Sequence, residues 1–229
     1  MSERIEEEAA EREGRYFCQS VKNVSLTFLR EVPFRTWDQW LRKIMKPKRY
    51  THTLGVTQTA VFLADRFGAN QDRVRAAAFL HDCCKNHERD CFEKLVSKGI
   101  LREADWAPSP IQHAHLGALW CRHMLGIEDE EIIHAIWAHT TGCAGMTPVD
   151  RIVYLADLIE PNRAYPGINR IRAIALQDLD EALLASMEHT LDYLAHSDMA
   201  IDPETIRARD DVKKMCSRKR EEYAWTSKK

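Results

Sequence analysis

Apolar residues recur at three- and four-residue spacing from Thr51 toward the C-terminus, which is the pattern of amphipathic helices. Alternating apolar and polar runs and Asn-Gly hairpin turns are absent from the sequence, so we expect no β-sheet. The predicted helices cover roughly residues 52–67, 71–82, 87–97, 110–125, 129–139, 149–159, 179–196 and 203 onward. Glycines at 68, 99 and 126 stand where three of these helices should end. The pattern predicts an all-α fold.

The first 48 residues follow a different pattern. Residues 1–14 are dominated by charged side chains and predict a solvated helix or a frayed terminus. Residues 15–48 contain an aromatic and apolar group, which predicts one or two helices packed on the main body. We therefore divide the chain into an N-terminal helical extension, residues 1–48, and a main domain, residues 49–229. The Trp-rich stretch 34–40 is either core or the surface of a homodimer.

Composition narrows the class of protein. The 229 residues are enough for one sizeable core, and a net charge of -2 gives no bias toward nucleic acid. Neither a signal-like apolar start nor a run of membrane-spanning length occurs, so we expect a cytoplasmic protein with no membrane partner. The seven cysteines form no Cys-x-x-Cys pair and are expected to be reduced thiols.

Carboxylates inside apolar runs are the strongest clue to chemistry. His81 and Asp82 interrupt the apolar segment 76–84, and Asp157 interrupts the segment 152–159. An ionised carboxylate in such surroundings is costly unless a cation or several hydrogen-bond donors meet it. Asp157 alone has a simpler explanation, a structural salt bridge with Arg151.

Several histidines are placed to accompany these carboxylates. His52 continues an apolar stripe on one helical face, and His139 ends an apolar helix. His113 and His115 lie on nearly opposite sides of one helix, so one of them should face the core, and we favour His113. Each histidine taken singly is more typical of a hydrogen-bonded core residue or a surface residue.

Taken together, the polar positions predict a metal centre. Imidazole and carboxylate ligands without thiolates suit zinc, iron or manganese. Four histidines and two aspartates are too many for one ion with an open position, whereas two ions sharing Asp82 would use them all. The candidate ligands are His52, His81, Asp82, His113, His139 and Asp157.

The order His, His-Asp, His, His, Asp resembles that of the HD phosphohydrolase superfamily. More specifically, residues 49–210 resemble the YqeK family, whose members are symmetrical diadenosine tetraphosphate hydrolases. The segments that carry this resemblance are RYTHTLGV at 49–56, LHDCCK at 80–85, HTTG at 139–142 with Gly145-Met146, and ADLIEPNR at 156–163. The last two are specific to the family, and the His-Asp doublet by itself is not.

The resemblance implies an HD-domain helical bundle and a division of the ligands between two ions. One ion would be held by His52, His81, Asp82 and Asp157, and the other by Asp82, His113 and His139. The family also implies iron, with manganese, cobalt or zinc as alternatives, in divalent or mixed-valence form.

The same resemblance gives roles to two cationic side chains. Lys85 and Arg163 are expected to contact substrate phosphates and, with Asp82, to take part in catalysis. Surface charge is the simpler explanation for both. Arg49, three residues before His52, extends the phosphate cradle in this hypothesis.

The expected reaction is the hydrolysis of diadenosine tetraphosphate to two ADP through a metal-bridging hydroxide. Another nucleotide phosphohydrolase and a cyclic-dinucleotide phosphodiesterase are alternatives, because a metal core does not define the leaving group. A non-catalytic nucleotide-sensing module is a further alternative. A P-loop enzyme is disfavoured because the sequence has no G-x-x-x-x-G-K-[ST] motif.

Overall fold

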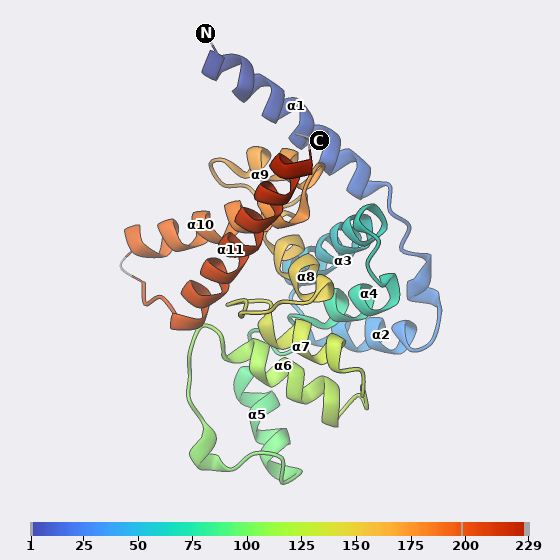
Figure 1. The fold of residues 1–229 in the computed structure, drawn as a ribbon. Coiled ribbons are helices and arrows are strands. Elements are labelled where there is room, and N and C mark those ends of the chain that lie inside the picture. Colours follow the sequence, from blue (N-terminus) through green and yellow to red (C-terminus); the bar gives the residue numbers. More distant parts are fainter. Residues whose placement is uncertain (1, 198, 227–229) are drawn as a thin grey trace.

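The computed structural model describes residues 2–197 and 199–226, which form helices joined by loops (Figure 1). Within these residues no β-strand occurs, which confirms the all-α prediction. The helices are α1 (Ser2–Lys22), α2 (Phe34–Ile44), α3 (Pro47–Phe67), α4 (Gln71–Leu80), α5 (Glu88–Ser97), α6 (Gln112–His123), α7 (Glu130–Ala138), α8 (Pro148–Ile159), α9 (Ile168–Ala175), α10 (Leu179–His196) and α11 (Pro203–Thr226), with short 3₁₀ turns η1 (Thr27–Arg30) and η2 (Glu103–Asp105).

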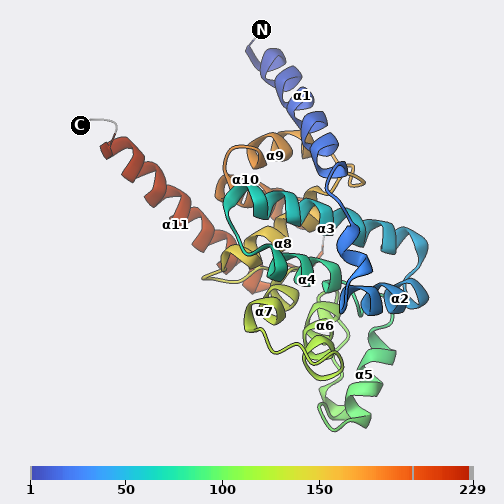
Figure 2. The ribbon, with the colours of Figure 1, turned by 90° about the vertical axis from the view of Figure 1, so that its right-hand side faces the viewer.

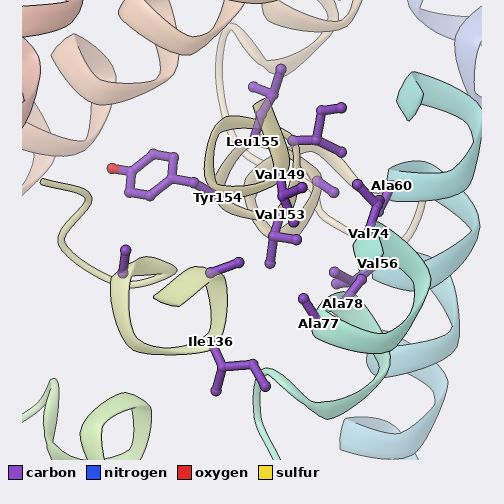
Figure 3. Close-up of a cluster of buried hydrophobic side chains, with 14 of the residues drawn as sticks. Val56, Ala60, Val74, Ala77, Ala78, Ile136, Val149, Val153, Tyr154 and Leu155 are labelled. Atoms are coloured by element: carbon purple, nitrogen blue, oxygen red, sulfur yellow. The ribbon is translucent and has the colours of Figure 1, made fainter. Parts of the chain in front are cut away.

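The centre of the molecule is a bundle of α3, α4, α7 and α8, which pack on one another. Their facing side chains form an apolar cluster that includes Val56, Ala77, Ile136 and Val153, all fully buried (Figure 3). Such close packing fixes the helices relative to one another, because a shift would open voids in a dense interior. The ends of these four helices are therefore rigid platforms for the polar residues described below.

Helix α3 begins at Pro47, five residues before the start that the apolar stripe predicts. Proline suits the first helical position because the amide that it lacks would have no partner there, and Lys46 before it is extended. The helix ends at Gly68, whose φ of 69° is left-handed, as the sequence predicted. The early start places Arg49 within α3.

Helices α4 and α7 both end just before a histidine that belongs to the candidate site. The prediction that the helix continues through Asp82 is wrong: α4 stops at Leu80, and His81 and Asp82 lie in the turns that follow it. The Nδ1 atom of His81 contacts the carbonyl of Ala78 at 2.7 Å, and His139 makes the same contact to Ile136 after α7. Each ring thus satisfies a carbonyl at the end of its own helix.

Helix α9 is absent from the sequence prediction. It has only 8 residues and follows Gly167, whose φ is 82°. Ile168, Ile171 and Ala175 form its buried stripe, but so short an apolar pattern is not distinctive in the sequence. Helix α1 packs on α9, and Glu11 accepts a hydrogen bond from Asn169 at 2.8 Å. The start of the chain therefore contacts a helix that lies far from it in sequence.

The segment 15–48 packs on the main body, as predicted. Phe17 of α1 is fully buried, and Trp40 of α2 stacks on Trp120 of α6 with ring centroids 5.7 Å apart. The N-terminal turns of α1 extend away from the bundle, as does the end of α11 (Figure 2). All seven cysteines are free. Among the described helices, none combines the length and hydropathy needed to cross a bilayer.

Candidate metal centre

Asp82 lies at the centre of the candidate site, and its side chain is only 3% exposed. The Nε2 atoms of four histidines surround its carboxylate. Those of His81 and His113 lie 3.4 Å away, that of His139 lies 3.7 Å away and that of His52 lies 3.9 Å away. These side chains come from α3, from the turns after α4 and α7, and from the start of α6, so the bundle brings together residues that are distant in sequence.

Asp157, in the last turn of α8, adds the second carboxylate. Its Oδ1 atom is 2.9 Å from Nε2 of His52 and accepts a 2.7 Å hydrogen bond from Nη2 of Arg163. The alternative salt bridge with Arg151 is wrong, because Arg151 pairs with Asp180 at 2.6 Å. All six candidate ligands therefore share one buried region.

Two of the histidines present a lone-pair nitrogen to Asp82. Nε2 of His81 is buried and makes no hydrogen bond, whereas Nε2 of His52 lies 2.9 Å from Oδ1 of Asp157. Because Nδ1 of His81 contacts a backbone carbonyl, that nitrogen carries the proton and Nε2 is left with a lone pair. The same holds for His139. Lone pairs of His81 and His139 that point at a buried carboxylate are unfavourable unless a cation joins them, so the arrangement fits a metal ion.

The distances define two overlapping sets of atoms that could hold an ion. Ligand atoms of His52, His81 and Asp157 lie within 4.8 Å of one another, and so do those of His81, Asp82 and His139. His113 joins the second set through its Nε2 atom, 3.2 Å from Nε2 of His139. His81 belongs to both sets, and Asp82 also approaches the first set, with Oδ2 3.9 Å from Nε2 of His52.

Both carboxylates are ionised inside the protein. Burial by itself would raise the pKa of Asp82, but the nearby histidines, His81 foremost, hold that pKa well below its usual range. Burial alone would also raise the pKa of Asp157, but the hydrogen bond with His52 and the charge of Arg163 hold that pKa well below its usual value. Two negative charges thus occupy a buried region, which favours cations beside them.

The histidines differ in charge. Burial disfavours the charged form of His52, yet the close carboxylates of Asp157 and Glu160 raise its pKa to about 9. An ion bound at this position would therefore displace a proton. Burial, followed by repulsion from His139, lowers the pKa of His113 to about 3. His113 is neutral at pH 7, the form that binds metals.

Between the two histidines of α6, the structure brings His113 and not His115 to Asp82. His113 also contacts Lys85, whose Nζ atom is 3.0 Å from its Nδ1 atom. His115 points the other way and stacks on Trp137, with ring centroids 5.3 Å apart. The opposite orientations follow from their spacing, because residues two apart project from different sides of a helix.

Three cations surround the buried carboxylates. Nη1 of Arg49 donates to Oδ2 of Asp82 at 2.7 Å, while Arg163 and Lys85 contact Asp157 and His113 as described above. The side chains of Arg49 and Arg163 are 28% and 38% exposed, so a solute can reach them from outside. The arrangement can bind phosphate oxygens next to the candidate metal ligands.

One buried carboxylate beside the site was missed from the sequence. Glu160 is 1% exposed, and its Oε1 atom is 3.1 Å from Nδ1 of His52. Its Oε2 atom accepts hydrogen bonds of 2.7 and 2.9 Å from the backbone and side-chain nitrogens of Asn162. A Cβ atom on Gly55 would overlap this carboxylate, so the glycine makes room for it. The sequence signal that could have revealed Glu160 is its position at the end of the apolar run that contains Asp157.

Comparison with known proteins defines the class. Residues 49–162, which hold all six candidate ligands, match the HD domain family. A crystal structure of a predicted HD superfamily hydrolase involved in NAD metabolism, from Clostridium acetobutylicum, superposes with a TM-score of 0.70 at 29% identity. The match covers 80% of this chain and 97% of that one. Fold and sequence both identify an HD-domain protein of the hydrolase type.

Two curated relatives narrow the family. The symmetrical bis(5'-nucleosyl)-tetraphosphatase of Bacillus subtilis is 37% identical over 69% of this chain and 86% of its own length. The protein of the same name from Halalkalibacterium halodurans is 37% identical over 73% of this chain and 90% of its own length. The chain belongs to this family of HD-domain hydrolases, which confirms the family predicted from its motifs.

Proposed function

We propose that this protein hydrolyses diadenosine tetraphosphate symmetrically to two ADP, with divalent transition-metal ions in the candidate site. The observation that carries the proposal is the convergence of four imidazoles and two carboxylates on one buried region, with the Nε2 atom of His81 left unbonded. The names of the relatives supply the substrate class.

The ligand assignment follows the two sets of atoms. His52, His81 and Asp157 would hold one ion, with Asp82 between it and a second ion held by His113 and His139. Bound ions of this kind lower the pKa of water and neutralise charge on phosphate oxygens. Iron is our proposal for the metal, and manganese, cobalt or zinc would suit the same ligands.

The protein's own cations would position the phosphate chain. Arg49 holds Asp82 through Nη1, and Arg163 holds Asp157 through Nη2 and Nε, which leaves other guanidinium donors free for phosphate oxygens. Lys85 offers a further ammonium from the turn after Asp82. Three positive groups around two buried carboxylates would align the central phosphates and offset charge that develops on them.

The proposed reaction consumes one water. An oxygen from water forms a bond to the second phosphorus from one adenosine, and the bond from that phosphorus to the central bridging oxygen breaks. The bridging oxygen leaves with the other half, and the water protons pass to solvent, so each product is ADP.

The test is the variant Asp82→Ala in protein prepared with its natural metal. We expect loss of bound metal, measured by elemental analysis, and loss of diadenosine tetraphosphate cleavage, measured by chromatography of the products. Asp72→Ala is the matched control, because this aspartate on α4 is 90% exposed and lies outside the candidate site. An Asp82→Ala protein that keeps its metal and its activity would refute the scheme.

A substrate panel tests the identity of the reaction separately. Diadenosine tetraphosphate should give ADP as the sole product, whereas asymmetric cleavage would give ATP and AMP. Cleavage of a cyclic dinucleotide in its place, or binding of nucleotides without turnover across iron, manganese and cobalt, would replace the proposed function with one of the alternatives.

A further inference from the structure

A pocket of about 450 Å³ lies directly beside the candidate metal centre. Its walls come from the end of α8, from the loop between α8 and α9, and from α10. The residues that decide its character are Leu158, Arg163, Tyr165, His189, Tyr193 and Leu194. Helix α10 contributes half of them, although it supplies none of the candidate metal ligands.

The pocket and the metal centre share a wall. Arg163 lines the pocket, and its guanidinium holds Asp157 through two hydrogen bonds, from Nη2 to Oδ1 at 2.7 Å and from Nε to the backbone oxygen at 2.9 Å. Leu158, the next residue, lines the pocket as well. A phosphate on Arg163 would therefore carry its attached nucleoside to the mouth of this pocket.

The lining suits a flat, largely apolar group. Tyr165 and His189 form a stacked pair with ring centroids 4.5 Å apart and an interplanar angle of 22°, and two leucines add aliphatic surface. Ligand pockets are mostly apolar and aromatic with a few polar groups, and bases stack on aromatic side chains. A phosphate chain without a base would make few favourable contacts with such an apolar lining.

Tyr193 also lines the pocket and is 59% exposed, so a solute can reach its ring. Two larger hollows, of about 770 and 470 Å³, are lined mainly by charged and polar side chains of α11 and of α1 with the start of α9. Neither hollow shares a residue with the candidate site, whereas the pocket with Tyr193 shares Arg163.

We propose that this pocket binds one of the two nucleosides of the dinucleoside polyphosphate, with the base against the aromatic side chains of Tyr165, His189 and Tyr193. The assignment rests on the proposed function, because it takes the phosphate chain to lie at Arg163. In this assignment the cations bind the phosphates, and side chains of α10 bind the base.

The test compares Tyr193→Ala with Tyr193→Phe in metal-loaded protein. Loss of the ring should raise KM for diadenosine tetraphosphate about tenfold with little change in kcat, and should weaken competitive inhibition by ADP by the same factor. Tyr193→Phe keeps the ring and should behave like the unaltered protein. Inhibition by inorganic pyrophosphate, which has no base, should be equal in all three proteins.

Two further variants complete the test. His189→Ala removes one member of the stacked pair and should also raise KM. Tyr16→Ala removes a tyrosine of similar exposure, 63%, on α1, and should change nothing. Equal KM values for Tyr193→Ala and the unaltered protein would overturn the pocket assignment. An equal weakening of pyrophosphate inhibition in Tyr193→Ala would overturn it too, because the phosphate site would then be altered.

Failure of the pocket and failure of the proposed function have different signatures. If the unaltered protein cleaves diadenosine tetraphosphate and Tyr193→Ala is equally efficient, the pocket is wrong and the function stands. If the unaltered protein does not cleave it, ADP titration by calorimetry still tests the pocket. Weaker binding of ADP by Tyr193→Ala than by Tyr193→Phe supports the pocket, and equal binding overturns it.

Discussion

The orientation of each candidate ligand ring is set by what its Nδ1 atom contacts. His81 and His139 use backbone carbonyls at the ends of their own helices, which fixes Nε2 as the atom that faces the carboxylates. His52 lies within helix α3, and its Nδ1 atom instead contacts Oε1 of Glu160 at 3.1 Å. A carboxylate behind a ligand histidine fixes the tautomer and raises the basicity of the ring.

Glu160→Gln should therefore weaken metal binding while leaving all six ligands in place. The amide keeps the shape of the side chain but loses the charge, so we expect metal affinity to fall by about 10- to 100-fold. Competition with a chelator, followed by elemental analysis, measures the change. Glu188→Gln on the exposed side of α10 is the control and should retain metal as the unaltered protein does. Equal affinity in both variants would show that Glu160 has no influence on the site.

At the scale of the helices, α3 closely approaches the turn after α8. Gly55 lies in the middle of α3, where alanine would normally stabilise a helix by about 1 kcal/mol. An added Cβ atom would overlap the Glu160 carboxylate, which is held between His52 and Asn162. The glycine is thus a requirement of this helix packing rather than of the α3 backbone.

Gly55→Ala should accordingly displace Glu160 and reproduce the weaker metal binding of Glu160→Gln. In the double variant the two losses should not add, because both act through the same contact with His52. Gly117→Ala in α6 is a matched control, since its Cβ atom would meet no atom closer than 3.4 Å. We expect it to retain metal and to gain up to about 1 kcal/mol of stability. If the losses of metal affinity add fully in the double variant, Gly55 does not act through the contact between Glu160 and His52.

On the scale of the whole molecule, the N-terminal helix is tied to the main domain by packing. Helix α1 lies on α9 and α3, so the first residues of the sequence cover elements of the main domain. Phe17 is fully buried and makes an edge-to-face contact with Phe62 of α3 at 5.5 Å. The division at residue 48 into extension and main domain stays a prediction, and the stability of the chain can test it.

Phe17→Ala should lower the free energy of unfolding by about 3–5 kcal/mol, because it leaves a cavity between α1 and the bundle. Urea unfolding followed by circular dichroism and by tryptophan fluorescence measures this loss and shows whether one transition accounts for both signals. Tyr16→Ala, next to it but 63% exposed, should change the free energy by less than about 0.5 kcal/mol. An unchanged main transition in Phe17→Ala would place α1 outside the cooperative unit.

Local patterns in the sequence were enough to predict the helical class, the family and the six polar positions of the candidate site. These follow from local patterns, because a helix repeats every 3.6 residues and a carboxylate within an apolar run is anomalous wherever the run packs. The choice of His113 over His115 was also available, since it depends on which side of one helix faces inward.

Tertiary structure alone decided which residues meet across helices. Arg151 pairs with Asp180 and leaves Asp157 to His52 and Arg163, and no spacing in the sequence distinguishes these partners. The contact of Glu160 with His52, which joins residues 108 positions apart, is equally invisible in sequence. The pocket formed with α10 is likewise defined only by packing. Contacts between helices depend on how side chains interlock at each crossing, and local periodicity does not contain that information.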